Sequence, residues 1–219
     1  MAFAVNDAQR SAKRFVQSTL KQLGIELEGR VRMGRPEGRF DVEVASHHSQ
    51  PLPELLKPVL EKSDNIYSDS LLKTMGVKSF HAPGSYYSGA KAMRQALEEQ
   101  GVDISTARLV DGSGLSRYNH ISARGLTDIL ALSLSLWGEE APWLKAREKN
   151  THWVKSGTMS GVNNLVGIVF PPEGKEPLLF SVMINGLWPE SPEDKQAVRA
   201  FYKELRGFYK DFVGVLSES

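Results

Sequence analysis

The sequence contains no cysteine, which excludes a disulfide framework, a cysteine-based zinc site and a thiol nucleophile. It has no excess of one charge either. With a formal net charge of +1 at pH 7, the chain lacks the basic surface that attracts nucleic acids, so no nucleic-acid partner is expected. No apolar run approaches the roughly 18 residues of a membrane-spanning helix. The first residues, MAFAVND, lack the basic and long apolar regions of a signal peptide.

The composition is that of an ordinary globular protein. Of 219 residues, 41% are hydrophobic and 24% are charged, which suits a sizeable core. No repeat or linker divides the chain, so a single domain over residues 1–219 is expected. Five histidines raise the alternative of a metal hydrolase. His47 and His48 would point to opposite sides of an extended segment, and the other three show no ligand spacing, so neither a metal site nor a cofactor is predicted.

Apolar spacing and turn residues predict both helices and strands. Helices are expected over residues 8–23, 54–62, 66–75, 88–100, 122–137 and from Ser191 onward. Strands are expected over residues 25–33, 40–45, 153–161, 162–170 and 178–184. The last helix carries an apolar stripe that is expected to pack against the sheet: Val198, Phe201, Leu205, Phe208 and Phe212.

The run Lys155-Ser156-Gly157-Thr158 stands at the edge of one predicted strand. Its ammonium group supplies positive charge, and its two hydroxyls can donate directed hydrogen bonds. Gly157 has no side chain and would let a substrate backbone lie against the strand. This combination suits a substrate carboxylate, although a common surface turn is the alternative that the run alone leaves open.

The run Ser63-Asp64-Asn65 lies at the junction of two predicted helices, where small polar residues are commonly caps. Capping is therefore the alternative for this motif. Further on, Asp111–Asn119 (DGSGLSRYN) predicts a tight turn, because its two glycines and small hydroxyl residues permit positive φ and local capping. A Ser-x-Asn loop followed by a Lys-Ser/Thr-Gly strand is also the second and third motif of the penicillin-recognising serine acyltransferases.

The wider pattern resembles the D-alanyl-D-alanine carboxypeptidase/endopeptidase family of penicillin-binding protein 4. The resemblance rests on Lys62–Asn65, Pro83-Gly84, the DGSGLSRYN run and Lys155–Thr158, and it covers nearly the whole chain. It implies an α/β (α+β) fold: the C-terminal part of a penicillin-binding-protein/β-lactamase-like transpeptidase fold, with an antiparallel sheet flanked by helices. It also implies a periplasmic location, with peptidoglycan stem peptides and β-lactams as partners.

The same resemblance implies a serine acyl-transfer mechanism, in which a serine attacks the D-Ala-D-Ala carbonyl and water releases the acyl-enzyme. Ser63 would pass a proton to the leaving amine, and Asn65 would hydrogen-bond the substrate amide. Lys155 would tune this proton relay and attract the terminal carboxylate. Ser156 and Thr158 would hold that carboxylate, and the N–H of Thr158 would supply half of the oxyanion hole. The Asp111–Asn119 run would be a structural turn near the site.

The family's nucleophile belongs to a Ser-x-x-Lys motif far upstream of Ser-Asp-Asn, and the pairs Ser18/Lys21 and Ser70/Lys73 have that spacing. Ser18 and Lys21 lie mid-helix, away from the apolar face of the first helix, and should point into water. Ser70 and Lys73 follow Ser63 on the same predicted helix and cannot line the opposite wall of a pocket. The chain is therefore predicted to carry the second and third motifs without the nucleophile.

Two other features bear on this prediction. Residues 139–150 form a shorter segment than the family usually has before its Lys-Thr-Gly strand, and Ser156 replaces the usual threonine but keeps the hydroxyl. The family's sheet uses strands from both ends of the full chain, so a C-terminal part should expose a sheet edge. The alternative to an enzyme is a noncatalytic remnant that binds peptidoglycan or protein, including the missing N-terminal part or a second copy.

Overall fold

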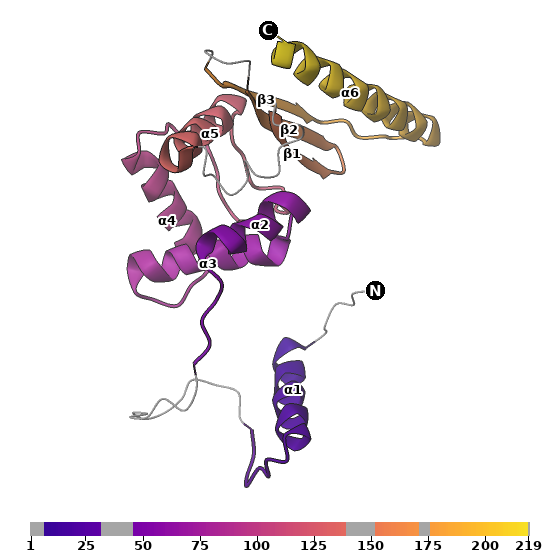
Figure 1. Ribbon diagram of the computed structural model, residues 1–219. Coiled ribbons are helices and arrows are strands. Elements are labelled where there is room, and N and C mark those ends of the chain that lie inside the picture. Colours follow the sequence, from indigo (N-terminus) through magenta and orange to yellow (C-terminus); the bar gives the residue numbers. More distant parts are fainter. Residues whose placement is uncertain (1–6, 32–45, 139–151, 171–175, 219) are drawn as a thin grey trace. The chain divides into compact units, whose positions relative to one another are not determined.

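The computed structural model describes residues 7–31, 46–138, 152–170 and 176–218 (Figure 1). The chain falls into two compact units, residues 1–48 and 49–219. The expectation of one domain over the whole chain stays a prediction. In the part of the chain that the structure describes, no helix has both the length and the apolar character needed to cross a membrane.

The first unit contains α1, Ala8–Gln22, which begins where the sequence predicts it. The carboxylate of Asp7 caps the helix by accepting the N–H of Arg10 at 2.8 Å. The strand predicted over residues 25–33 is not found in its described part, residues 25–31. A strand needs a hydrogen-bonding partner, and the predicted partner over residues 40–45 lies outside the described residues.

The second unit opens with three helices, α2 (Leu52–Lys62), α3 (Asn65–Phe80) and α4 (Tyr86–Glu99). Helices α3 and α4 approach closely because glycines face each other at their crossing. A Cβ atom added to Gly89 would lie 2.7 Å from the carbonyl carbon of Leu72, and one added to Gly76 would lie 2.7 Å from the backbone nitrogen of Gly89. The two helices therefore pack backbone against backbone, which only residues without a side chain allow.

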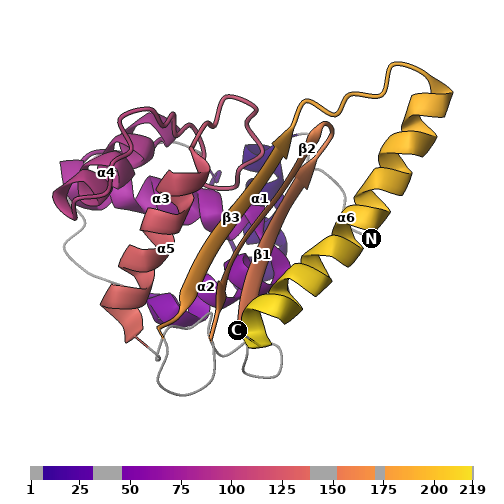
Figure 2. The same cartoon turned by 90° about the horizontal axis from the view of Figure 1, so that it is seen from above.

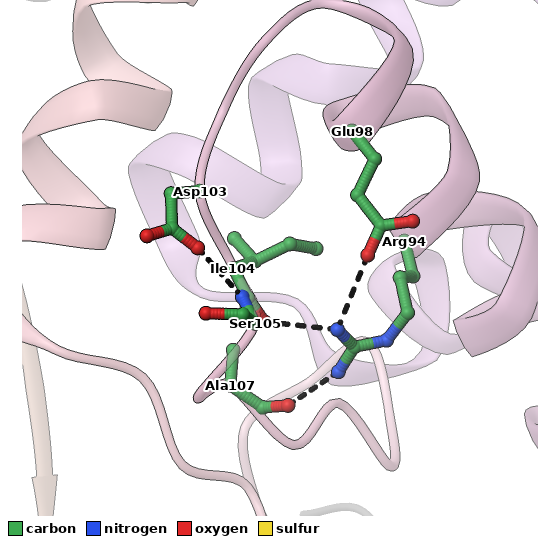
Figure 3. A network of polar contacts seen from close by, with 6 residues as sticks. All are labelled: Arg94, Glu98, Asp103, Ile104, Ser105 and Ala107. Atoms are coloured by element: carbon green, nitrogen blue, oxygen red, sulfur yellow. Dashed lines mark hydrogen bonds and ion pairs between the residues drawn. The ribbon is translucent and has the colours of Figure 1, made fainter.

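Arg94 of α4 forms hydrogen bonds with the segment that follows the helix (Figure 3). The guanidinium of Arg94 donates to the carbonyl oxygens of Ile104, at 2.9 Å, and of Ala107, and it pairs with Glu98 at 3.5 Å. In the same turn, the backbone N–H of Ser105 lowers the pKa of the Asp103 carboxyl by hydrogen bonding to it. These contacts anchor the segment that continues into the Asp111–Asn119 turn.

Helix α5 (Ala123–Trp137) is followed by an antiparallel sheet of β1 (His152–Met159), β2 (Val162–Val169) and β3 (Leu178–Asn185), in that order. Helix α6 (Pro192–Glu218) completes the unit. The sheet lies between α5 and α6 (Figure 2). One face packs Trp153 and Ile168 against Leu130 of α5. The other face packs Leu165, Val169 and Phe180 against Leu205, Tyr209 and Val213 of α6. The predicted antiparallel sheet flanked by helices is confirmed.

The apolar stripe of α6 is confirmed only in part. Leu205 is buried against the sheet, but Phe201 and Phe208 are 41% and 56% exposed, so the prediction is wrong for these two residues. The buried row instead runs through Leu205, Tyr209 and Val213, four residues apart. Successive residues of a helix are about 100° apart around its axis, and the apolar residues of α6 spread over a wider angle than the strip of the helix surface that the sheet covers. Phe201 and Phe208 lie beyond one margin of that strip.

Candidate functional site

The Ser63-Asp64-Asn65 run is both a helix junction and part of a cleft. Asp64 is the cap of α3, because its carboxylate accepts the N–H groups of Ile66, at 3.0 Å, and Tyr67, at 3.1 Å. Ser63 ends α2 in the left-handed conformation, with φ at 54°. The capping role therefore falls on the middle residue and leaves the two flanking side chains available for other contacts.

Lys155 lies on β1 and joins the two motifs. Its ammonium group donates a hydrogen bond to the hydroxyl of Ser63, 92 residues earlier in the chain. In β1, Lys155 shares a face of the sheet with Trp153, which places it on the side that packs against α5. Partial burial lowers the pKa of the Lys155 ammonium below that of an ordinary lysine.

The outer edge of β1 turns main-chain groups away from the sheet. The N–H of Gly186 donates to the carbonyl of Gly161 at 2.9 Å, so these two residues form a hydrogen-bonded pair. Hydrogen-bonded pairs alternate along an antiparallel ladder, so the main-chain groups of odd-numbered residues in β2 point toward β3 and those of even-numbered residues point toward β1. Thr158 pairs with Asn163, an odd-numbered residue. The N–H and C=O of Thr158 therefore point off the outer edge of β1, where no strand pairs within the described residues.

A cleft of about 1160 Å³ lies between the helices and this edge. Its lining includes all six residues that the sequence predicts for the site: Ser63, Asn65, Lys155, Ser156, Gly157 and Thr158. A Cβ atom added to Gly157 would meet nothing within 4 Å, so the strand borders open space at this point. The structure thus gathers the predicted residues around one cavity, while their individual chemical roles stay predictions.

The Asp111–Asn119 turn forms another part of the cleft lining. The carboxylate of Asp111 accepts the N–H groups of Gly114, at 2.7 Å, and Ser116, at 2.6 Å, and the side-chain amide of Asn119 at 2.8 Å. Asn119 in turn accepts the N–H of Val110 at 2.7 Å. The turn is therefore braced internally by its first and last residues.

Asp69 of α3 holds this turn against the helix, and sequence reasoning missed it. Its carboxylate accepts the N–H groups of Gly112 and Ser113, each at 3.0 Å, and the hydroxyl of Tyr86 at 3.0 Å. A Cβ atom added to Gly112 would lie 2.8 Å from the carbonyl carbon of Ser68, so the turn lies directly on α3. The signal in the sequence is weak because two of the partners are main-chain groups 43 and 44 residues away.

Replacing Asp69 by alanine is expected to lower the free energy of unfolding by about 2 kcal/mol, because three donors lose a charged acceptor. Asp69→Asn keeps one acceptor oxygen, so its free energy of unfolding should fall by clearly less than that of Asp69→Ala. Urea unfolding of both variants measures the difference. A loss below about 0.5 kcal/mol for Asp69→Ala, the range of ordinary surface substitutions, would show that the turn does not depend on this carboxylate.

A third Ser-x-x-Lys match, Ser88/Lys91, was missed in the sequence, and Ser88 lies in the first turn of α4, where its N–H donates to the hydroxyl of Ser85 at 3.0 Å. None of the three matches lies among the described residues that line the cleft. The hydroxyl of Ser18 donates to the carbonyl of Phe15 on α1 at 2.9 Å. Ser70 is exposed on α3, and the ammonium of Lys73 lies 3.9 Å from the ring centroid of Tyr86. One premise is corrected: Ser63 precedes α3 and does not share a helix with Ser70, because Asp64 starts a new one. Within the described residues, no group of three or more histidine, aspartate or glutamate side chains is placed to hold a metal.

Comparison with known proteins identifies the family. The D-Ala-D-Ala carboxypeptidase 3 (S13) family model matches residues 1–146. The chain belongs to this family. The S13 match includes Ser63 and Asn65 and ends before β1, so the hydrogen bond between Lys155 and Ser63 is what joins the third motif to the matched part.

Individual S13 relatives extend the match over most of the chain. The chain is 29% identical to the D-alanyl-D-alanine carboxypeptidase DacB of Haemophilus influenzae over 86% of its own length and 38% of that protein. It is 34% identical to the D-alanyl-D-alanine carboxypeptidase of Actinomadura sp. strain R39 over 89% of its length and 40% of that protein. The chain thus spans about two fifths of the length of these curated relatives.

A solved S13 structure gives the fold. Penicillin-binding protein 4 (dacB) of H. influenzae, complexed with a novel β-lactam, is 28% identical with a TM-score of 0.75. The match covers 94% of this chain and 53% of that one. The resemblance to the penicillin-binding protein 4 family and the fold class predicted from it are confirmed.

Proposed function

We propose that the cleft is one part of a serine-type D-alanyl-D-alanine carboxypeptidase/endopeptidase site that acts on peptidoglycan stem peptides, with the acylating serine supplied by an element from outside the described residues. The hydrogen bond between Lys155 and Ser63 carries the proposal, because it brings a cation and a hydroxyl from the two motifs to one point. S13 membership supports the reaction class. The substrate would place the enzyme in the periplasm.

The proposed reaction has two steps. The serine hydroxyl attacks the carbonyl between the two D-alanines, the C–N bond breaks, and the hydroxyl proton passes through Ser63 to the leaving amine. Water then hydrolyses the acyl-enzyme and returns the proton to the serine. Lys155 would keep the relay oriented through its hydrogen bond to Ser63 and attract the terminal carboxylate.

The edge of β1 would hold the substrate. Ser156 and Thr158 would donate hydroxyl hydrogen bonds to the carboxylate, and Asn65 would bind the peptide amide. The N–H of Thr158, which points off the outer edge, is suited to one half of an oxyanion hole. Removing one such donor costs about 3–4 kcal/mol of transition-state stabilisation in other hydrolases.

The charge of the cleft lining supports an additional element in the site. Among the described lining residues Lys155 is the one lysine, so the second lysine of a Ser-x-x-Lys motif would have to enter with the nucleophile. The single lysine of the described lining also suits the second candidate, a noncatalytic module that binds muropeptides without acylation.

A fluorescent penicillin separates the two candidates. We expect the chain alone to show no covalent band on a denaturing gel, and co-expression with the part of the H. influenzae relative that this chain does not match to restore one. A Lys155→Met variant should abolish the restored band, since it removes the proposed carboxylate contact. Weak reversible binding without restored labelling would favour the noncatalytic module. Labelling of Ser18 or Ser70 would contradict the assignment of the site.

A further inference from the structure

Three segments meet at the end of the cleft remote from Lys155. The guanidinium of Arg117, in the Asp111–Asn119 turn, donates to the carbonyl of Ser160 at 3.1 Å. Its central carbon lies 4.8 Å from the ring of Trp188, which follows β3. The same indole covers the β1–β2 turn, because a Cβ atom added to Gly161 would lie 2.8 Å from its Cε2 atom.

Trp188 is thus held in place and still faces the cavity. Arg117 and Gly161 contact its indole from two different segments, which restricts its rotation. The side chain nevertheless lines the cleft, and the residue is 55% exposed. A large aromatic ring that is fixed in an open cavity offers contact area to a ligand at little cost in side-chain entropy.

The part of β1 that lines the cleft runs from Lys155 toward the turn that Trp188 contacts. On β1 its lining begins at Lys155 and runs to Met159, without Trp153 or Val154. At about 3.3 Å per residue, Met159 lies roughly 13 Å along the strand from Lys155. A peptide that has its terminal carboxylate at Lys155 and follows this strand along the cleft extends its preceding residues toward Trp188.

On the basis of the proposed function, we propose that Trp188 is a specificity-determining residue that contacts the part of the peptide preceding D-Ala-D-Ala. The peptide backbone would follow the outer edge of β1, and the side chain before the two D-alanines would pack on the indole. Short ligands that end at the D-alanines would not reach it. Trp188 should therefore matter for long ligands and not for short ones.

The test compares two ligands with the full chain, by titration followed with NMR. The short ligand is Nα-acetyl-D-Ala-D-Ala, and the long one is Nα,Nε-diacetyl-L-Lys-D-Ala-D-Ala. Trp188→Ala is expected to raise the dissociation constant of the long ligand between about threefold and tenfold, the usual range for an aromatic contact, and to leave the short ligand unchanged. Trp188→Phe should keep most of the preference. Tyr87→Ala is the matched control, an 80% exposed aromatic residue outside the cleft lining.

The outcomes separate this proposal from the one on which it rests. Equal weakening of both ligands by Trp188→Ala would mean that the indole only supports the turn, and would overturn this proposal alone. An unchanged affinity for the long ligand would also overturn it. Failure of the unmodified chain to bind either ligand would contradict the proposed function, and the role of Trp188 with it.

Discussion

Replacing Lys155 by methionine is expected to weaken binding of Nα,Nε-diacetyl-L-Lys-D-Ala-D-Ala by about ten- to a hundredfold while the fold is kept. A hydrogen bond to a charged group contributes about 1.5–3 kcal/mol, and the proposed contact joins the ammonium of Lys155 to the peptide carboxylate. Methionine preserves most of the side-chain length and removes the charge. Titration of both proteins with the peptide, together with urea unfolding, measures the two quantities separately.

Lys73→Met is the matched control for this variant. Lys73 also lies on an ordered element, with its ammonium 3.9 Å from the ring centroid of Tyr86, but it does not line the cleft. Its replacement should leave peptide affinity unchanged. If the two variants had the same affinity as the unmodified chain, Lys155 would not be the carboxylate contact.

The lowered pKa of Lys155 gives this binding a pH dependence. A carboxylate beside the ammonium stabilises its protonated form, so binding favours Lys155 with its proton. As the pH rises through the lowered pKa, the free chain loses that proton and affinity falls, at a lower pH than for an ordinary lysine with a pKa near about 10.4. Between the folded and unfolded pKa values the unfolded state binds more protons, so the contribution of Lys155 to stability rises with pH there. Lys155→Met should lack both effects.

Sequence patterns predicted the parts of the site that depend on local structure. The turn at Gly161 separates two strands as expected, and Asp111–Asn119 forms the tight turn that its glycines and hydroxyl residues indicate. The meeting of Ser63 and Lys155 came from family resemblance, since no spacing rule connects residues 92 positions apart. The contact between the two motifs could therefore be predicted from the family resemblance and not from local patterns.

Contacts that depend on the packing of distant segments could not be read from the sequence. Asp69 binds backbone N–H groups, which every residue type carries, so its partners leave no pattern. Trp188 contacts Gly161, and a glycine at this position is already explained by the positive φ of the turn, so the sequence gives no sign of the contact. The exposure of Phe208 depends on where the sheet ends, whereas helical periodicity gives only the direction of the apolar arc. In each case the missing information is the position of a second element.

A second large effect is expected at the crossing of α3 and α4, where Gly89→Ala should lower the free energy of unfolding by about 2–3 kcal/mol. The added methyl group would lie 2.7 Å from the carbonyl carbon of Leu72 and closer still to its oxygen. Because these atoms belong to the backbone of α3, no side-chain rotation relieves the overlap. The two helices must separate, and this cost outweighs the gain of about 1 kcal/mol that alanine brings to a helix.

The matched control is Gly207→Ala in α6, where an added Cβ atom meets nothing within 4 Å. The free energy of unfolding of that variant should rise by up to about 1 kcal/mol, because alanine has a higher helix propensity than glycine and its methyl group meets no other atoms here. Urea unfolding of both variants gives the comparison, and equal stability of the two would show that α3 and α4 tolerate a wider spacing. The effect should reach the cleft as well. Helix α3 carries Asp69, which holds the Asp111–Asn119 turn, so separation of the helices should weaken peptide binding in Gly89→Ala and leave it unchanged in Gly207→Ala.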